Sequence, residues 1–340
     1  MSELRFHQVA PDASDAEIAA WHAAYVASDT HARVDACPFR LAETVDMVRV
    51  PTAYRWFGAW SAHRDDTLVA VGFVETPLAD NLHLAQVEVQ VVPEFRRQGI
   101  GSALLARLEG EARARGRVSA IAEVSYPLEA PEDGAGSASA EFARAHGFEF
   151  ALGDIQRRCA LPIDEELLEG LAASAAPHHA GYRLVSFAGP VPDEWVEGVA
   201  AMAGSLVVEA PMGELDMEAE DASVSGWRDR EASLERQGLT PWHTLALDAA
   251  GVPVAYTSVA VSADDKALCH QWGTLVVPAH RGHRLGLAVK VANHRALQAE
   301  GVPAAEIATW NAAVNEHMIG VNELLGFHRV GRLGEFQKRL

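Results

Sequence analysis

The sequence contains few cysteines, and their arrangement excludes two common kinds of small-domain scaffold. Cys37, Cys159 and Cys269 are far apart, form no CxxC pair and are odd in number. A disulfide framework or a zinc ribbon needs closely spaced, paired cysteines. We therefore expect three buried thiols in a reducing compartment and no metal site.

Positive charge is also scarce. The 28 lysines and arginines are outnumbered by 47 aspartates and glutamates, which gives a formal net charge of −19. Binding to a phosphate backbone requires concentrated positive charge, so nucleic acid is excluded as a partner. An acidic surface favours a cationic amine substrate, although a merely solubilising surface would have the same composition.

Long hydrophobic runs are missing as well. No stretch reaches the roughly 18 apolar residues that cross a membrane, and the first residues lack a basic segment followed by an apolar one. These absences predict a cytoplasmic protein without membrane contact.

The second half of the sequence repeats the order of signals in the first half. The same offset of 185 residues separates Pro93 from Pro278 and Gly101 from Gly286. With 340 residues and 49% hydrophobic content, the chain is long enough for two compact domains. We predict an N-terminal domain over 1–162, a linker over 163–180 and a C-terminal domain over 181–340.

Each half is expected to begin with a strand and a helix and to continue with a hairpin. A strand, a glycine-containing turn and a helix follow, and a last strand–helix–strand unit passes through a Gly-Phe pair. This alternation predicts an α/β sandwich around a mixed sheet. The expected opening strands are 4–9 and 182–187, the first helices 15–28 and 193–203, the hairpins 55–77 and 241–261, and the strand–turn–helix segments 87–116 and 272–301.

The turn after the fourth strand of the first half is a candidate phosphate site. It reads Arg96-Arg97-Gln98-Gly99-Ile100-Gly101 and leads into a helix, whose first N–H groups are free to bind an anion. Glycines allow close approach of a diphosphate, and the arginines supply charge. Neither the GxxxxGK[ST] pattern of ATP-binding loops nor the GxGxxG pattern of dinucleotide-binding turns occurs.

At these residues the sequence resembles a known family. The run VVPEFRRQGIGSALL is similar to the signature of the GNAT superfamily of N-acetyltransferases, and the resemblance extends over both halves. It implies two tandem GNAT folds, each a mixed, mostly antiparallel sheet flanked by helices, with acetyl-CoA as acyl donor. The residues it assigns to the donor are Val91, Val92, Arg96, Arg97, Gln98, Gly99, Ile100, Gly101 and Ser102 in the first half, and Val276, Val277, Arg281, Gly282, His283, Arg284, Leu285, Gly286, Leu287, Asn311, Asn315 and Met318 in the second.

The second copy departs from the signature at one glycine, which Arg284 replaces, and crowding of its phosphate site is a possible consequence. The segment HRGHRLGLAVK nevertheless resembles two-domain GNAT proteins in which arginine is usual there.

Catalytic candidates differ between the halves. Glu88, on the strand before the turn, is the candidate general base, or else an ordinary strand glutamate. Gly273 takes its place in the second half. The tyrosine that many GNAT enzymes use to protonate the thiolate is missing, and Asn322 stands at that position in the second copy as the other catalytic candidate.

A polar stripe of Asn311, Asn315, Met318 and Asn322 in the second half either binds pantetheine amides or substrate, or only caps and crosslinks the fold. On this basis we expect the second half to perform the chemistry. Four histidines there are alternative bases, and three tryptophans are candidate pocket residues or core residues: His270, His280, His283 and His317, and Trp227, Trp242 and Trp310.

The sequence thus predicts an acyl-CoA-dependent N-acyltransferase that moves acetyl directly from acetyl-CoA to a small-molecule amine. Two alternatives stay open: a non-catalytic acyl-CoA-binding protein with a degenerate GNAT pair, and transfer of another acyl group or to a hydroxyl. The protein is expected to be a monomer or a homodimer.

Overall fold

A computed structural model describes residues 3–340, which form two compact units. Unit 1 contains the chain up to Asp154, together with Gly213–Met217 and Gly331–Leu340; unit 2 contains Ile155–Met212 and Glu218–Val330. Neither unit is a single continuous stretch, because the last ten residues belong to unit 1. The domain limits 1–162, 163–180 and 181–340 stay a prediction.

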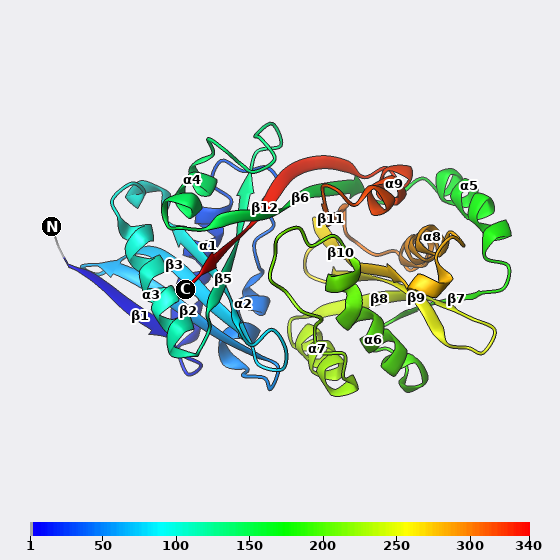
Figure 1. Ribbon diagram of the computed structural model, residues 1–340, viewed down its shortest axis with the longest axis horizontal. Helices are drawn as coiled ribbons and strands as arrows, with labels where there is room; N and C mark the ends of the chain where they lie inside the picture. The colour runs from blue at the N-terminus through cyan, green and yellow to red at the C-terminus, as the bar shows by residue number, and fades with distance from the viewer. Residues whose placement is uncertain (1–2) are drawn as a thin grey trace. The chain divides into compact units, whose positions relative to one another are not determined.

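Unit 1 is a mixed sheet with helices on both faces (Figure 1). Its strands lie in the order β1-β2-β3-β4-β5-β12, and only the β4–β5 pair among the pairings described in this unit is parallel. The elements are β1 (Leu4–Val9), α1 (Asp15–Asp29), α2 (Leu41–Arg49), β2 (Arg55–Arg64), β3 (Thr67–Pro77), β4 (Leu84–Val91), η1 (Pro93–Phe95), α3 (Ile100–Ala114), β5 (Ser119–Tyr126), α4 (Ala138–Ala145), β6 (Glu149–Ala160) as far as Asp154, and β12 (His328–Arg339) from Gly331.

Alternation along the strands of unit 1 produces two separate apolar layers. Val71 and Phe73 of β3 pack under α1 with Trp21, whereas Ala70 and Val74 on the opposite face pack under α3. Period-two burial on a sheet with helices on both sides explains why β3 reads as an almost continuous apolar run.

Unit 2 repeats this arrangement. Its strands lie in the order β7-β8-β9-β10-β11-β6, with α6 and α7 on one face and α8 on the other (Figure 1). The elements are α5 (Glu165–Ala175), η2 (Ala176–His178), β7 (Arg183–Ala188), α6 (Asp193–Glu209), α7 (Val224–Arg236), β8 (Leu239–Leu247), β9 (Pro253–Ser262), β10 (Leu268–Val276), η3 (Pro278–His280), α8 (Leu285–Ala299), β11 (Glu306–Ala312) and α9 (Glu316–Leu324).

The predicted fold class is confirmed, and most elements lie where the sequence predicts them. Strand β1 has the predicted bounds, and α1 begins at Asp15, where Ser14 caps it by accepting a hydrogen bond from the Glu17 N–H. The segment 163–180 contains α5, whose Leu168 and Ala175 are buried in the core of unit 2. No helix within residues 3–340 is both long enough and apolar enough to cross a membrane.

The sheet of unit 1 depends on the last strand of the chain. Strand β12 pairs with β5 from Arg332↔Tyr126 to Arg339↔Ser119, and its Phe336 is fully buried in the α3-side core. We predict that Phe336→Ala lowers the stability of unit 1 by about 3–5 kcal/mol, because it removes a buried ring and leaves a cavity. Urea unfolding measures the change. Leu82→Ala, at an exposed side chain, is the control, and equal midpoints for the two variants would contradict the prediction.

Candidate functional site

The site in unit 1 begins where two parallel strands separate. Strand β4 stays paired with β3 as far as Ala70↔Val91, but its pairing with β5 ends at Gln86↔Ile121. Beyond Gln86 the edge of β4 that faces β5 is therefore not used by the sheet. Such an edge presents N–H and C=O groups that can pair with an extended ligand.

The turn that follows β4 has the backbone geometry of an anion-binding site. Arg97 and Gly99 both have left-handed backbone, with φ of 62° and 77°, and Gly99 caps α3. At the start of α3 the N–H groups of the first turn have no intrahelical acceptors. Arg96 to Gly99 are exposed, and a Cβ added at Gly99 would meet nothing within 4 Å.

The residues of this turn fit a diphosphate. Arg96 is anchored, because its Nε donates to the Val91 carbonyl at 3.0 Å and its Nη2 to the Ser28 carbonyl at 2.9 Å. Arg97 has no hydrogen-bond or ion-pair partner in the described part of the chain, so its guanidinium is available to an anion. The helix start and Arg97 together supply the donors that a pyrophosphate needs.

The corresponding turn of unit 2 has the same backbone with the residue types exchanged. Gly282 and Arg284 have φ of 86° and 51°, so glycine and arginine have swapped between the two left-handed positions. Arg284 therefore does not change the path of the turn, although a left-handed non-glycine residue is uncommon. The backbone of the turn is therefore the same in both units, despite the replacement of glycine by Arg284.

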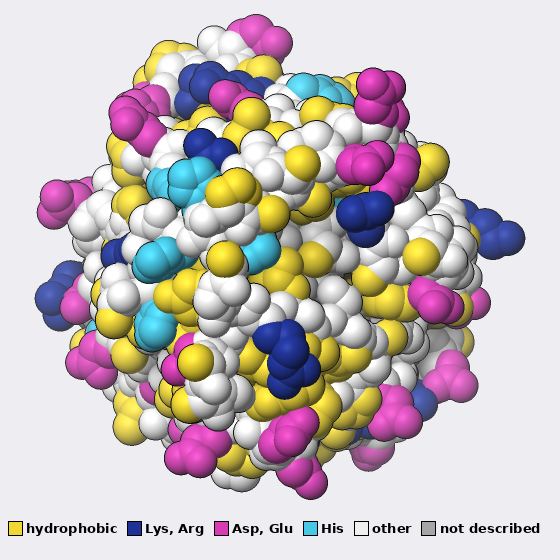
Figure 2. All heavy atoms as spheres, turned by 90° about the vertical axis from the view of Figure 1, so that its right-hand side faces the viewer, with side chains coloured by type: hydrophobic (Ala, Val, Ile, Leu, Met, Phe, Trp, Pro, Cys, Tyr) yellow, Lys and Arg dark blue, Asp and Glu magenta, His cyan; other side chains and the backbone are white. Residues whose placement is uncertain are grey.

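The basic side chains in the turn of unit 2 are engaged within the unit. Arg281 bonds Glu209 at 2.6 Å, Arg284 donates to the Ser174 carbonyl at 3.2 Å, and His283 contacts the His178 carbonyl at 3.1 Å. Figure 2 shows unit 2 from the side that carries α5, where several histidine side chains lie on the surface. Fewer free charges face an anion here than in unit 1.

Glu88 lies on β4, two residues beyond the end of the β4–β5 pairing. It is partly buried on the α1 side of the sheet, opposite Phe73, and its Oε1 accepts a hydrogen bond from Gln90 at 2.9 Å. Burial raises the pKa of Glu88 to about 7. The negative charge of Asp29 also raises this pKa, whereas the hydrogen bond from Gln90 lowers it. A carboxyl group with this pKa is suited to accept a proton near neutral pH.

Three further carboxylates of unit 1 are electrostatically coupled to one another. Glu123 of β5 and Glu335 of β12 are directly opposite in the strand register, and Asp154 of β6 acts on both. Desolvation and this repulsion raise the pKa of Glu123 to about 7 and that of Glu335 to about 8. Like charges opposite each other destabilise a sheet, so the pair is tolerated best when at least one of the two carboxyl groups is protonated. Residues 3–340 contain no group of three His, Cys, Asp or Glu side chains arranged to hold a metal ion.

The predicted asparagine stripe in unit 2 has mainly internal partners. Asn315 caps α9 by accepting a hydrogen bond from the Met318 N–H at 3.2 Å. Asn322 is fully buried; it accepts from Lys290 Nζ at 2.7 Å and donates to Asn311 Oδ1 at 2.6 Å. The pKa of the buried Lys290 falls to about 7 by desolvation. This network stiffens the region between α8, β11 and α9.

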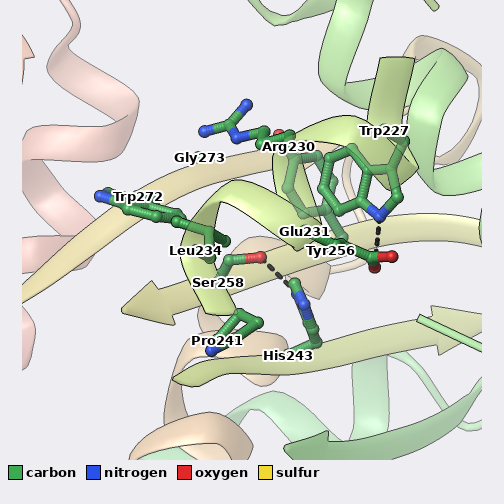
Figure 3. Close-up of a pocket in the computed structure, with 10 residues that line it drawn as sticks. All are labelled: Trp227, Arg230, Glu231, Leu234, Pro241, His243, Tyr256, Ser258, Trp272 and Gly273. Carbon is green, nitrogen blue, oxygen red and sulfur yellow. Dashed lines mark hydrogen bonds between the residues drawn. The ribbon is translucent and has the colours of Figure 1, made fainter. Parts of the chain in front are cut away.

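Gly273, the counterpart of Glu88, borders a small cavity in unit 2 (Figure 3). A Cβ at Gly273 would lie 2.4 Å from the hydroxyl of Tyr256, so no larger residue fits there. The cavity has a volume of about 20 Å³. Its lining comes from α7, β8, β9 and β10: Trp227, Arg230, Glu231, Leu234, Pro241, His243, Tyr256, Ser258, Trp272 and Gly273.

Comparison with known proteins agrees with this geometry. Residues 56–150, which contain the turn of unit 1, match the family model described as an acetyltransferase (GNAT) domain. A tandem GNAT protein from the clavulanic acid biosynthesis pathway is 26% identical; the alignment covers 99% of this chain and 98% of that one, with a TM-score of 0.81. No curated protein matches the sequence.

Two more distant structures share the fold. A GCN5-related N-acetyltransferase from Sphaerobacter thermophilus has 16% identity and a TM-score of 0.64, covering 98% of this chain and 95% of that one. A putative acetyltransferase from Pyrococcus horikoshii has 13% identity and a TM-score of 0.55, covering 99% and 89%. The fold and the strand–turn–helix site together define a GNAT-type acetyltransferase. Residues 56–150 of unit 1 carry the match to the GNAT domain model, and over its whole length the chain is similar in fold to a tandem GNAT protein.

Several residues at these sites were not singled out from the sequence. Glu123 and Glu335 are over 200 positions apart, and only the exchange of β12 into unit 1 brings them opposite each other. The offset of 185 relates Ser258 to Phe73 of the first copy, so this change from an apolar to a polar residue is visible in the sequence. His243 is opposite Ser258 in the strand register. Trp227 borders the cavity beside Gly273, whereas Trp242 and Trp310 do not.

The coupled carboxylates predict an unusual dependence of stability on pH. Glu335 has a folded-state pKa of about 8 against an ordinary value of 4.5, so the folded protein binds more protons between these pH values and loses stability as pH rises through them. Glu335→Gln should therefore raise the melting temperature by about 2–4 °C at pH 8.5, which is roughly 1 kcal/mol, and leave it almost unchanged at pH 4.5. Thermal unfolding at both pH values tests this, with the exposed Glu149→Gln as control. An equal shift at both pH values would refute it.

Proposed function

We propose that the protein is an acetyl-CoA-dependent N-acetyltransferase whose unit 1 transfers acetyl directly to a small cationic amine. The observation that carries the proposal is the position of Glu88. It lies just beyond the point where β4 leaves β5, on the strand that leads into the anion-binding turn. Acetyl-CoA supplies an activated thioester, and the protein must align an amine with it and remove a proton.

The chain offers a continuous set of donor-binding groups. The free edge of β4 up to Val91 is suited to the pantetheine amides, and the turn from Arg96 to Ser102 is suited to the diphosphate. A Cβ added at Gly101 would lie 3.3 Å from side-chain atoms of Val91 and Phe142, which is tighter than an ordinary contact, so a side chain at this position would crowd the floor of the site. These residues would hold the donor in a fixed position next to the acceptor, and such positioning lowers the entropic cost of bringing the two reactants together.

Glu88 is the proposed general base. With a pKa of about 7 it is largely able to accept a proton at physiological pH and is still basic enough to take one from the attacking nitrogen. Gln90 holds one of its oxygens and thereby fixes the direction of the carboxylate.

A cationic acceptor fits the charges of unit 1. Glu123 and Glu335 retain protons near neutral pH, because burial raises their pKa values and repulsion from neighbouring carboxylates raises them further. An ammonium group would supply that counterion, and a diamine would supply one for Glu88 as well. We therefore favour small diamines as the acceptors of unit 1. The protein itself is proposed to be a monomer or homodimer in the cytoplasm.

These features favour unit 1 as the catalytic half, in contrast to the expectation from the asparagine stripe. Unit 1 combines a free arginine, an accessible turn and a carboxyl base. The candidates in unit 2 are otherwise engaged, since Asn322 is buried and His280 bonds the Tyr182 hydroxyl at 2.9 Å.

Ser102→Glu should abolish binding of the donor without harming the fold. Ser102 is exposed in the first turn of α3, where a carboxylate stabilises the helix but repels phosphate. We expect the affinity for acetyl-CoA in unit 1 to fall at least tenfold while the melting temperature stays the same or rises. Titration calorimetry and thermal unfolding measure both, with Ser102→Ala as the neutral control. Unchanged affinity would argue against this turn as the donor site.

Glu88→Gln should lower the turnover of 1,4-diaminobutane by about 10²–10⁴-fold, the usual value of a general base. In the wild type, kcat/KM should fall about tenfold per pH unit below pH 7, since protonation of Glu88 removes the base. Release of the coenzyme A thiol, followed from pH 5.5 to 9, gives both results. Gln90→Glu is the matched control, because it adds a carboxylate next to Glu88 and should move the pH midpoint upward. A pH-independent rate would contradict the role of Glu88.

A further inference from the structure

A histidine of unit 1 lies beside the anion-binding turn, and the proposed chemistry does not use it. His146 follows the last residue of α4, and its Nε2 is 2.8 Å from the Oγ of Ser102 in the first turn of α3. Its Nδ1 is 2.7 Å from the carbonyl oxygen of Phe142. Since both ring nitrogens have partners, and these lie on two different helices, the imidazole is held in one orientation next to the proposed donor site.

The partners of His146 determine its tautomer when the ring is neutral. A carbonyl oxygen only accepts hydrogen bonds, so Nδ1 carries the proton and donates it to Phe142. Nε2 then has a lone pair, and the hydroxyl of Ser102 must donate to it. In this state the hydroxyl proton of Ser102 is directed to the ring, and Ser102 offers no donor to an anion at the turn.

Protonation of His146 reverses this hydrogen bond. An imidazolium donates from both nitrogens, so Ser102 Oγ becomes the acceptor and its own proton is free for another partner. A phosphate oxygen at the start of α3 can accept that proton, and it also gains a positive charge nearby. A bound anion therefore favours the protonated ring.

The charges around His146 disfavour the protonated ring until an anion binds. The acidic side chains of the neighbouring helices are paired with basic side chains within the unit, and no ion pair described in residues 3–340 includes His146. The start of α3 and the arginines of the turn add positive charge. The charged groups on the elements around His146 are Glu141 and Arg144 of α4, Glu109 of α3, Lys338 of β12, Arg64 of β2, and Arg96 and Arg97 of the turn.

Unit 2 has an apolar pair in place of this polar one. At the offset of 185, Ser102 corresponds to Leu287, and counting back from the Gly-Phe pair of each half relates His146 to Leu325. Both leucines are buried in one core cluster of unit 2. The fold therefore does not require a polar pair at this place, and the pair belongs to the unit in which donor binding is proposed.

From these observations we infer that His146 and Ser102 couple binding of the donor diphosphate in unit 1 to the uptake of a proton. This rests on the proposed function. The proton comes from solvent and is bound at Nε2, while Nδ1 keeps its own proton. Ser102 then donates to a phosphate oxygen and accepts from Nε2. His146 acts through Ser102 and through its charge, so it is a positioning residue.

The coupling makes the affinity for the donor depend on pH. The complex binds more protons than the free protein, so affinity rises as pH falls and decreases as pH rises. This is opposite to the effect expected of Glu88, whose protonation below pH 7 removes the base. The KM for the donor should therefore increase with pH, whereas kcat should fall below pH 7.

Proton uptake on binding tests the inference without turnover. The probe is acetyl-3′-dephospho-coenzyme A, whose diphosphate does not titrate near neutral pH. Titration calorimetry of the full chain at about pH 7, in two buffers of different ionisation enthalpy, gives the protons taken up per molecule bound. We expect roughly 0.2–0.6 proton for the wild type, because histidine is partly protonated in this range, and less than about 0.1 for His146→Leu, which introduces the residue of unit 2.

The pH dependence of binding gives a second readout. Between about pH 6.5 and 8.5 the Kd of the wild type should rise about three- to tenfold, and that of His146→Leu by less than about twofold. His146→Gln, which is polar but does not titrate, should behave as His146→Leu, and this separates charge from packing. His7→Leu, at an exposed histidine of β1, is the matched control and should keep the uptake of the wild type. Thermal unfolding verifies the fold of each variant.

Ser102→Glu separates the two proposals. If this variant binds the probe with the affinity and stoichiometry of the wild type, the turn is not the donor site, and the proposed function of unit 1 and the coupling are both overturned. If Ser102→Glu loses binding but His146→Leu and His146→Gln take up as many protons as the wild type, only the coupling is overturned. A wild type that binds the probe without proton uptake has the same consequence.

Discussion

The separation of β4 from β5 is the constraint on which the rest of unit 1 depends. Strand β4 continues along β3 to Val91 but leaves β5 after Gln86, so a stretch of backbone inside the sheet lacks its second neighbour. Buried backbone without partners is costly, and a fold keeps it only where a ligand can replace the missing strand. Glu88, the turn and the helix start all lie beyond this one opening. Unit 2 repeats the opening, since β10 pairs with β11 only as far as His270↔Ala308.

The two copies have kept the backbone of the opening and changed the side chains around it. At the turn, glycine and arginine exchange places between two left-handed positions, which leaves the path of the chain intact. Beside the opening, a carboxylate has been exchanged for the Tyr256 hydroxyl and a histidine–serine pair. Duplication conserves the part that depends on backbone geometry, while the part that sets acceptor chemistry is free to vary.

Much of the fold could be predicted from the sequence because it depends on local signals. The start of α1 follows from its serine cap, and the strand–turn–helix unit from glycine spacing and an apolar run. The path of β12 into unit 1 could not be predicted, because the burial pattern of a strand is the same whichever sheet it joins. For that reason the sequence alone does not identify Glu335 as a neighbour of Glu123. The composition of 163–180 predicts a linker, and this segment contains α5, whose Leu168 is buried in the core of unit 2.

The candidate site was predicted where chemistry resides in the backbone and less well where it resides in side chains. Gly99 and Gly101 define the turn in any context, since their requirement is conformational or steric. The sequence leaves open whether the partners of Asn322 are a ligand or the fold itself, and its hydrogen bonds to Lys290 and Asn311 are structural partners that spacing alone does not reveal. A polar residue on a helix becomes a candidate for chemistry only when its other hydrogen-bonding groups are already satisfied.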